Sequence, residues 1–163
     1  MTNQELEVAA TKYAELCKIT LNLKTPLGKG QDGCVWKSSR KTAVKAFERP
    51  FSYDTELECY QRFKDNRVIR IQGFSVPQLF GFSDDLLIIE MSIVAPPYIL
   101  DFAKAWLDNP PDFSAEALAD HAEKSRELFG ERWRDVASLA WALREFGIYY
   151  YDTNPGNIRF GDD

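Results

Sequence analysis

The sequence has few cysteines, no long apolar run and no excess of basic residues, and each absence removes a class of protein. Its three cysteines, Cys17, Cys34 and Cys59, are isolated and odd in number, so neither a disulfide framework nor a thiolate zinc site is expected. The longest apolar run, Leu86–Ile89, is far shorter than a membrane span, and the first fifteen residues lack a basic start followed by an apolar stretch. We therefore expect a cytoplasmic protein without a membrane partner.

The charge balance argues against nucleic acid as a partner. Lys and Arg total 20 against 25 Asp and Glu, a net charge of -5, and no basic surplus is present to bind a phosphate backbone. The charge is uneven, because residues 1–50 carry a net +4 and the remainder carry -9. The basic first third could attract an anionic ligand, or it could be a solvated lysine face.

What the sequence does have is the composition of a globular domain, with 163 residues, 45% hydrophobic and 13% aromatic. Helical spacing predicts a leading helix over Gln4–Cys17, with an apolar stripe that extends from Leu6 to Leu16, and a second helix over Phe51–Phe63. Five antiparallel strands are expected around them, at residues 19–23, 27–36, 42–47, 76–80 and 86–91.

Beyond Ala95–Pro97 the pattern becomes helical, and we place a boundary there. Helices are expected over residues 99–107, from an N-cap at Ser114 to Gly130, and over Glu131–Phe146, followed by a turn-rich loop and a short strand. The sequence thus predicts an α+β fold of two lobes, with a five-stranded antiparallel sheet and one inserted helix in residues 1–94. Residues 95–163 form a short, mainly helical second lobe.

Three glycines, Gly28, Gly30 and Gly33, form a GxGxxG pattern that is ambiguous by itself. A dinucleotide-binding site requires a helix immediately after the glycines, whereas Cys34–Trp36 is short, prone to form a strand and soon followed by another strand. We therefore favour a hairpin. Glycines at its tip would allow backbone N–H groups to approach phosphate oxygens closely.

Lys45 lies in the strand 42–47, where the period of two places it on the face of Ala43 and Phe47. A lysine that points inward needs an anion, and the helix 51–63 offers two. Glu56 shares a helix face with Tyr60 and Phe63, whereas Glu58 lies on another face near Arg62, so we predict that Glu56 binds Lys45. The alternative is an edge lysine whose ammonium reaches water.

The segment Asp152–Asn157 places a carboxylate and a carboxamide on either side of a Pro-Gly turn. An aspartate can accept or orient a hydroxyl proton, and an asparagine oxygen can bind Mg²⁺. The alternative is an Asx-type turn in which both side chains satisfy only local backbone donors.

Taken in order, these segments resemble the protein-kinase-like superfamily. LGKGQDGCVWK is similar to its glycine-rich loop, TAVK to its lysine strand and LLIIEMS to the strand that leads to its hinge. DTNPGN resembles the catalytic loop of the atypical branch, of the aminoglycoside and choline kinase type and of the coenzyme-Q-biosynthesis type. The resemblance implies a Mg²⁺- and ATP-dependent phosphotransferase whose acceptor the sequence does not identify.

The resemblance also implies roles for single residues. Val35 and Ala43 would enclose adenine, and the backbone of Glu90 and Ser92 would bind its edge. Lys45 would contact the α- and β-phosphates and be held by Glu56. Asp152 would be the catalytic base, and Asn157 would be a Mg²⁺ ligand.

Two departures from the family pattern affect these expectations. Tyr150 replaces a histidine that is usually structural. The family's second Mg²⁺ ligand, the aspartate of a DFG-like motif, would follow Asn157 by roughly a dozen residues, and Asp162 or Asp163 is the candidate within the segment that follows. The alternative function is a pseudokinase that acts as a nucleotide-binding or protein-interaction module. Trp106, Trp133 and Trp141 predict an apolar patch for a protein partner or a second copy of the chain.

Overall fold

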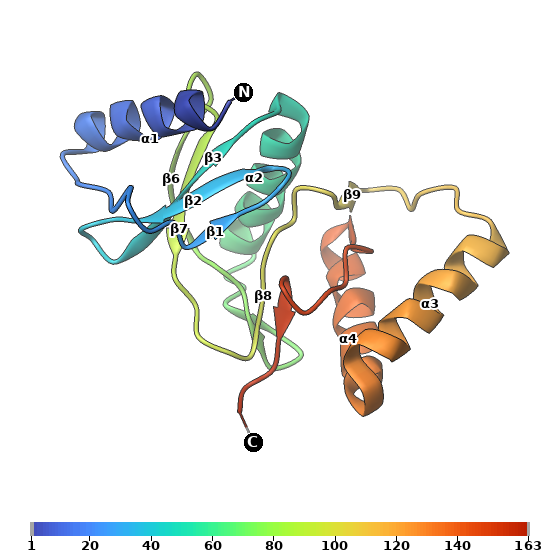
Figure 1. The fold of residues 1–163 in the computed structure, drawn as a ribbon. Helices are drawn as coiled ribbons and strands as arrows, with labels where there is room; N and C mark the ends of the chain where they lie inside the picture. The colour runs from blue at the N-terminus through green and yellow to red at the C-terminus, as the bar shows by residue number, and fades with distance from the viewer. Residues whose placement is uncertain (1, 163) are drawn as a thin grey trace.

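The computed structural model describes residues 2–162 and has an α+β architecture around a five-stranded antiparallel sheet (Figure 1). The sheet has the order β1-β2-β3-β7-β6 and consists of β1 (Gly28–Lys29), β2 (Gly33–Lys37), β3 (Thr42–Phe47), β6 (Leu79–Ser83) and β7 (Ile88–Ser92). The predicted number of strands is confirmed, but the first strand is different. Leu21 forms only an isolated bridge with Ser38, and the glycine-rich segment supplies both β1 and β2.

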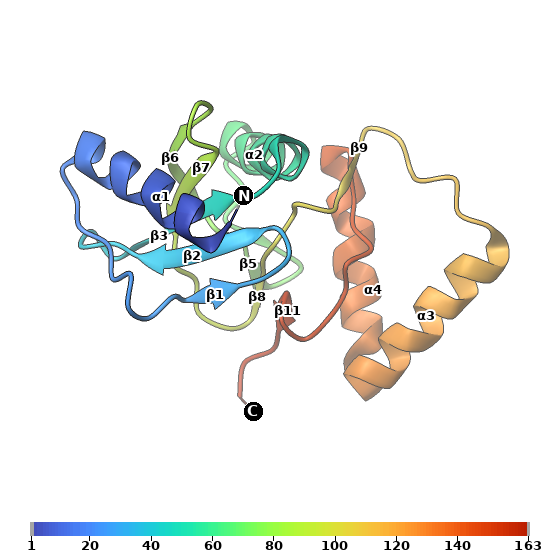
Figure 2. The same ribbon diagram turned by 45° about the horizontal axis from the view of Figure 1, so that its top comes forward.

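Helix α1 (Asn3–Cys17) covers one face of the sheet (Figure 2). It begins at a capping box in which Thr2 and Glu5 bond to each other's backbone N–H groups. The predicted apolar stripe is buried from Leu6 to Tyr13 and packs with Trp36, Val44 and Ile88. Leu16 is the exception, because it lies on the last turn of the helix and is 76% exposed.

Helix α2 (Pro50–Asp65) contacts β3, β6 and β7 and packs with the opposite set of sheet side chains. Side chains alternate along a strand, so Ala43 and Phe47 belong to the core under α2, whereas Val44 and Ala46 belong to the core under α1. Proline at the first position of α2 fits the helix start, where no N–H partner is needed. Lys45 lies on the same face of the strand as Ala43 and Phe47, so its side chain points towards α2.

The predicted strand at residues 76–80 is displaced to β6, because the N–H of Val76 bonds to the carbonyl of Ile69 outside the main sheet. A second sheet has the order β11-β8-β5-β4 and consists of β4 (Arg70–Ile71), β5 (Phe74–Ser75), β8 (Tyr98–Ile99) and β11 (Ile158–Arg159). It combines strands from both sides of residue 94. Pairing between backbone segments therefore crosses the boundary that the composition suggests.

The predicted helix over residues 99–107 is wrong. The segment contains β8, a turn and β9 (Trp106–Leu107), which pairs with β10 (Ile148–Tyr149). Asp101 has a φ of 60°, a left-handed conformation that interrupts a helix. The apolar residues of this segment are buried by tertiary packing instead, since Phe102 contacts the rings of Tyr60, Phe63 and Tyr150.

The predicted helices between residues 114 and 146 are present. Helix α3 (Ala115–Phe129) has Ser114 as its N-cap, and α4 (Trp133–Ala142) is flanked by the 3₁₀ turns η1 (Gly130–Arg132) and η2 (Leu143–Phe146). Val136, Leu139 and Leu143 join the core under α2. Of the three tryptophans that the sequence predicts to form an apolar patch, Trp106 and Trp141 are 49% and 68% exposed. The guanidinium of Arg126 stacks on the ring of the third, Trp133. Within residues 2–162, no helix has both the length and the hydrophobicity that crossing a bilayer requires.

Candidate functional site

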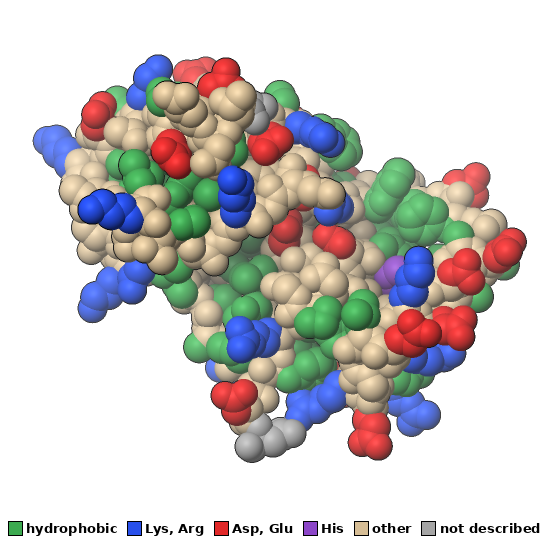
Figure 3. Space-filling view, in the orientation of Figure 1, with side chains coloured by type: hydrophobic (Ala, Val, Ile, Leu, Met, Phe, Trp, Pro, Cys, Tyr) green, Lys and Arg blue, Asp and Glu red, His purple; other side chains and the backbone are tan. Residues whose placement is uncertain are grey.

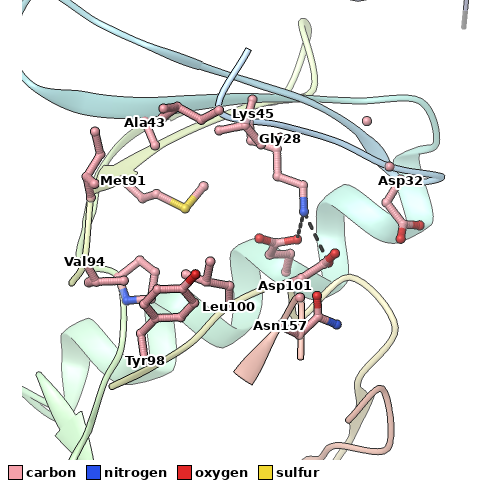
Figure 4. A pocket seen from close by; sticks show the side chains of 18 of the residues that line it. Gly28, Asp32, Ala43, Lys45, Met91, Val94, Tyr98, Leu100, Asp101 and Asn157 are labelled. Carbon is pink, nitrogen blue, oxygen red and sulfur yellow. Dashed lines mark hydrogen bonds and ion pairs between the residues drawn. The ribbon is translucent and has the colours of Figure 1, made fainter. Parts of the chain in front are cut away.

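A cavity of about 530 Å³ lies beneath the β1–β2 hairpin, between the main sheet and the segments that follow β7 and precede β11. In the space-filling view, acidic and basic side chains gather where the sheet part meets the helical part (Figure 3). The close-up shows that the cavity has two unlike ends (Figure 4). One end is apolar and is bordered by Ala43, Met91, Val94, Tyr98 and Leu100. The other end holds the charged and amide groups of Asp32, Lys45, Asp101 and Asn157.

The hairpin that covers the cavity depends on its glycines in different ways. Gly28 pairs with Val35, and the N–H of Gly30 bonds to the carbonyl of Gly33 at 3.0 Å. A Cβ at Gly33 would lie 1.9 Å from the carbonyl oxygen of Ala46, so only glycine lets β2 approach β3 at this point. A Cβ at Gly28 or Gly30 would meet open space. These two glycines leave the hairpin backbone uncovered beside the cavity that they line.

Lys45 and Glu56 form the ion pair that the strand and helix periodicities predict. Lys45 Nζ donates to Glu56 Oε2 at 2.6 Å, and both side chains are buried. Burial alone would lower the pKa of Lys45, but the adjacent carboxylates of Glu56 and Asp101 outweigh it and leave that pKa above its ordinary value. The lysine is therefore a fixed positive charge at this end of the cavity.

Glu56 is almost completely buried and accepts hydrogen bonds from two donors. Besides Lys45, the hydroxyl of Tyr60 donates to Glu56 Oε1 at 3.0 Å. Burial raises the pKa of Glu56 to about 7 against the opposing effect of Lys45, and the nearby charge of Asp101 acts in the same direction as burial. The predicted surface pair of Glu58 and Arg62 is also present, with a distance of 2.9 Å between Arg62 Nε and Glu58 Oε1.

Asp101 is the charged site residue beside Lys45 that sequence analysis missed. Its Oδ1 lies 3.2 Å from Lys45 Nζ, on the side of the ammonium that Glu56 leaves open. The β8–β11 pairing brings Asp101 beside Asn157, because the N–H of Leu100 bonds to the carbonyl of Asn157 at 2.8 Å. The sequence feature that indicates Asp101 as a site residue is the tripeptide Asp101-Phe102-Ala103, which directly follows two apolar residues. The helix predicted over residues 99–107 gives Asp101 no place beside Lys45.

Aromatic packing fixes the position of Asp101. Phe102 is fully buried, with ring centroids 5.7 Å from Tyr60 and 5.5 Å from Tyr150. Tyr150 donates its hydroxyl proton to the carbonyl of Leu100 at 3.0 Å, and burial raises its pKa well above the ordinary value. Tyr150 therefore remains neutral and links the segment before β11 to the segment that carries Asp101.

The loop before β11 combines an Asx-type turn with one side chain that reaches the cavity. The carboxamide of Asn154 accepts from the N–H of Gly156 at 2.9 Å, so Asn154 forms the Asx-type turn, whereas the alternative interpretation gave that role to Asp152 and Asn157. Asn157 Nδ2 donates to Asp152 Oδ2 at 3.1 Å, and its amide oxygen points towards Asp101 (Figure 4). Asn157 lines the cavity, whereas Asp152 lies beside it, 3.6 Å from Lys104 Nζ.

Most of the other predicted positions border the cavity, but Glu90 does not. Gly28, Gly30, Gly33, Val35, Ala43 and Ser92 all line it. The side chain of Glu90 lies on the α1 side of the sheet, where Tyr13 donates to it at 3.0 Å and Thr42 also donates to it. The apolar end is bordered instead by the residues that follow, Met91 to Val94. Asp163 lies outside the described residues.

The donor set at the charged end determines which metal it could hold. Among the described residues, no group of three histidine, cysteine or carboxylate side chains forms a metal site by itself. Asp101 and Asn157 together offer a carboxylate oxygen and an amide oxygen beside a cavity. This set fits Mg²⁺, which takes few protein oxygens and completes its shell with water and substrate phosphates.

Comparison of the sequence with models of known protein families finds no match, and no curated protein sequence matches it either.

Proposed function

We propose that the chain binds ATP with Mg²⁺ and transfers its terminal phosphoryl group, within a two-lobed fold similar to that of protein kinases. The observation that supports this proposal most strongly is the convergence of Lys45, Glu56, Asp101 and Asn157 at one end of a single cavity. A glycine hairpin covers that cavity, and its other end is apolar. A nucleotide has the same two-part character, with a flat apolar base joined to a string of phosphates.

The apolar end suits a purine base. Val35 and Ala43 lie above it in the sheet, and Leu100 and Tyr98 border it from the segment around β8. Residues 92–94 pass along its edge, so their backbone groups would take the hydrogen-bonding role that the resemblance gave to Glu90 and Ser92. The cavity volume of about 530 Å³ falls within the range that small-molecule sites usually have.

The charges around the other end require a metal-bound nucleotide. Asp32, Glu56, Asp101 and Asp152 surround the ammonium groups of Lys45 and Lys104 through the ion pairs of the site. Carboxylates outnumber ammonium groups in this set, so a free triphosphate would be repelled. Asp101 and Asn157 would hold Mg²⁺, which would supply the neutralisation that the phosphates need.

Asp101 takes the role that the family gives to an aspartate beyond the catalytic loop. In this chain the aspartate precedes the loop in sequence, and the antiparallel pairing of β8 with β11 sets the two side by side. This pairing would supply a carboxylate ligand beside Asn157 from a segment that precedes the loop in the sequence. Its tripeptide, Asp101-Phe102-Ala103, differs from DFG at the last residue only.

Each residue around the cavity would then have a separate role in phosphoryl transfer. Lys45 binds phosphate oxygens and is held in place by Glu56, while the hairpin backbone covers the phosphates. Asp152 lies at the mouth beyond Asn157 and would accept the proton of an acceptor hydroxyl as that oxygen attacks. Catalysis of this kind depends on positioning and charge, which the buried ion pairs provide.

A binding module without turnover is the second candidate function. Asp152 does not line the cavity, and its carboxylate is already occupied by Asn157 and Asn154. A protein that binds Mg²⁺ and ATP but leaves the terminal phosphate in place would have this arrangement. Release or transfer of radioactive phosphate from ATP, measured over hours, separates this candidate from a phosphotransferase.

Binding is tested by thermal denaturation with ATP, with and without Mg²⁺. We expect Mg²⁺ and ATP together to raise the midpoint of the wild-type protein, because only a ligand of the native state does so. Asp101→Asn keeps the shape but loses the charge, and we expect the affinity for Mg²⁺ and ATP to fall by about tenfold or more. Asp112→Asn on the exposed segment before α3 is the matched control. A wild-type midpoint that does not respond to millimolar ATP and Mg²⁺ would overturn the proposed function.

A further inference from the structure

Lys104 lies between the hairpin that covers the cavity and the loop at its mouth. Its Nζ is 3.6 Å from Asp32 Oδ2 in the glycine hairpin and 3.6 Å from Asp152 Oδ2. Asp32 and Asp152 belong to segments far apart in the sequence, and Lys104 comes from a third segment, the turn after Asp101. The ammonium of Lys104 therefore forms ion pairs both with the glycine hairpin, through Asp32, and with the proposed base, Asp152.

The backbone of Lys104 is fixed, while its side chain is free to move. The N–H of Ala105 bonds to the carbonyl of Phe102 at 3.0 Å, and Phe102, Ala103 and Ala105 are all buried. The side chain of Lys104 is 47% exposed, and both of its carboxylate distances exceed those of a hydrogen bond. Half-exposed ion pairs of this length are weak and exchange readily.

Both carboxylates would keep other partners if Lys104 left them. Ser52 Oγ donates to Asp32 Oδ1 at 3.0 Å from the first turn of α2. Asn157 donates to Asp152 at 3.1 Å. Lys45, by contrast, is buried between Glu56 and Asp101 at 2.6 and 3.2 Å and is far less free to move. Lys104 is therefore the cation of this set that is best able to turn towards an arriving anion.

We propose that Lys104 binds the terminal phosphoryl group of a nucleoside triphosphate and so makes the site prefer a triphosphate to a diphosphate. This inference rests on the proposed function. The oxygen of an acceptor hydroxyl forms a bond to the terminal phosphorus, the bond to the bridging oxygen breaks, and the diphosphate leaves with that electron pair. The hydroxyl proton passes to Asp152. Lys104 neither forms nor breaks a covalent bond. Its positive charge stabilises the phosphoryl group beside Asp152 throughout the transfer.

The test measures the affinities of ATP and ADP, each with Mg²⁺, by calorimetry. We expect the wild-type protein to bind ATP more tightly than ADP. Lys104→Met should weaken ATP binding about tenfold and leave ADP binding within about twofold, because ADP lacks the phosphoryl group that Lys104 contacts. Lys104→Arg keeps the charge and should keep the preference. Lys124→Met replaces an exposed lysine on α3 and should match the wild type.

Several outcomes would overturn the inference while leaving the proposed function intact. Equal losses of ATP and ADP binding in Lys104→Met would give the residue no role at the terminal phosphate. Tighter binding of both nucleotides would show that Lys104 only holds the hairpin closed over an empty cavity. Loss of the ATP preference in Lys29→Met, with Lys104→Met unchanged, would assign the terminal phosphate to the hairpin lysine that lines the cavity. A wild-type protein that binds neither nucleotide would overturn both proposals.

Discussion

Glu56 shows how one buried carboxyl group can couple the site to the stability of the fold. It is 1% exposed and lies between Lys45, whose charge favours ionisation, and a surrounding core that opposes it. Burial has the larger effect, and the pKa of Glu56 is raised to about 7. The folded protein therefore binds a proton at this position more tightly than the unfolded chain does.

We predict that Glu56→Gln removes a component of the pH dependence of stability. A carboxyl group with a raised folded-state pKa stabilises the fold fully below its ordinary pKa and loses that contribution as the pH rises towards the folded-state value. Between about pH 4.5 and pH 7, the free energy of unfolding of the wild type should fall relative to that of the variant, by up to about 3 kcal/mol. Lys45 does not contribute in this window, because its raised pKa acts at alkaline pH.

Urea denaturation at four pH values between 4.5 and 8 measures this difference. Glu116→Gln, an exposed position in the first turn of α3, is the control and should follow the wild type. Parallel pH profiles for the wild type and Glu56→Gln would contradict the assignment of a raised pKa to Glu56.

At this scale, what the sequence predicts depends on how far apart the interacting residues lie. The facing of Lys45 and Glu56 follows from two local periods, two in the strand and 3.6 in the helix, and the predicted contact is present. Asp101 joins the same cluster through contacts between distant segments, namely the pairing of β8 with β11 and the packing of Phe102 on Tyr60. No local pattern of residues predicts the pairing of β8 with β11. A strand of two residues is too short to show the alternation of side chains that identifies a strand.

Among the elements, the β2–β3 hairpin depends on a glycine at its cavity end. β2 pairs with β3 along its whole length, from Gly33 opposite Phe47 to Lys37 opposite Ala43. Gly33 has a φ of 152° and closes this pairing at the cavity end, where the Ala46 carbonyl leaves no room for a Cβ. The same strand carries Val35 over the apolar end of the cavity.

We predict that Gly33→Ala destabilises the protein by about 2–4 kcal/mol, because β2 must move away from β3 to admit the methyl group. Gly28→Ala is the matched control in the adjoining β1–β2 hairpin, and its methyl group meets open space, so its effect on stability should stay within about 0.5 kcal/mol. Thermal denaturation without ligand measures both. Equal stabilities of Gly33→Ala and Gly28→Ala would mean that the hairpin adapts without cost.

Helices α1 and α3 have local signals at their starts, which helps the sequence to predict them. Ser114 begins α3 with a 3.1 Å bond from the N–H of Ala117, and the capping box at Thr2 begins α1. Both signals lie within three residues of the helix start. The strands of the second sheet contain two residues each, and the contacts that define them come from distant segments. Their positions are a property of the whole fold.

The two parts of the molecule are joined by one continuous core rather than by a flexible link. Phe47 under the main sheet, Phe63 on α2 and Leu139 on α4 belong to the same cluster of buried residues. Arg62 adds a polar connection on the outside of this core. Its Nη1 and Nη2 donate to the two carboxylate oxygens of Asp108 at 2.8 and 2.9 Å, and Nη1 also donates to the carbonyl of Phe146 at 2.9 Å.

We predict that Arg62→Ala lowers the free energy of unfolding by about 2 kcal/mol. Most of the loss should come from the carbonyl of Phe146, which loses its donor, and from the guanidinium packing, since Asp108 is 65% exposed and can turn to water. Arg62→Lys should recover only part of it, because an ammonium cannot make both bonds to Asp108. Lys64→Ala, exposed on the same helix, should change stability by less than about 0.5 kcal/mol. If urea denaturation shows the same small effect for Arg62→Ala, then the buried core alone joins α2 to the helical part, and the position of Asp101 beside Lys45 depends on Phe102 and Tyr150 rather than on Arg62.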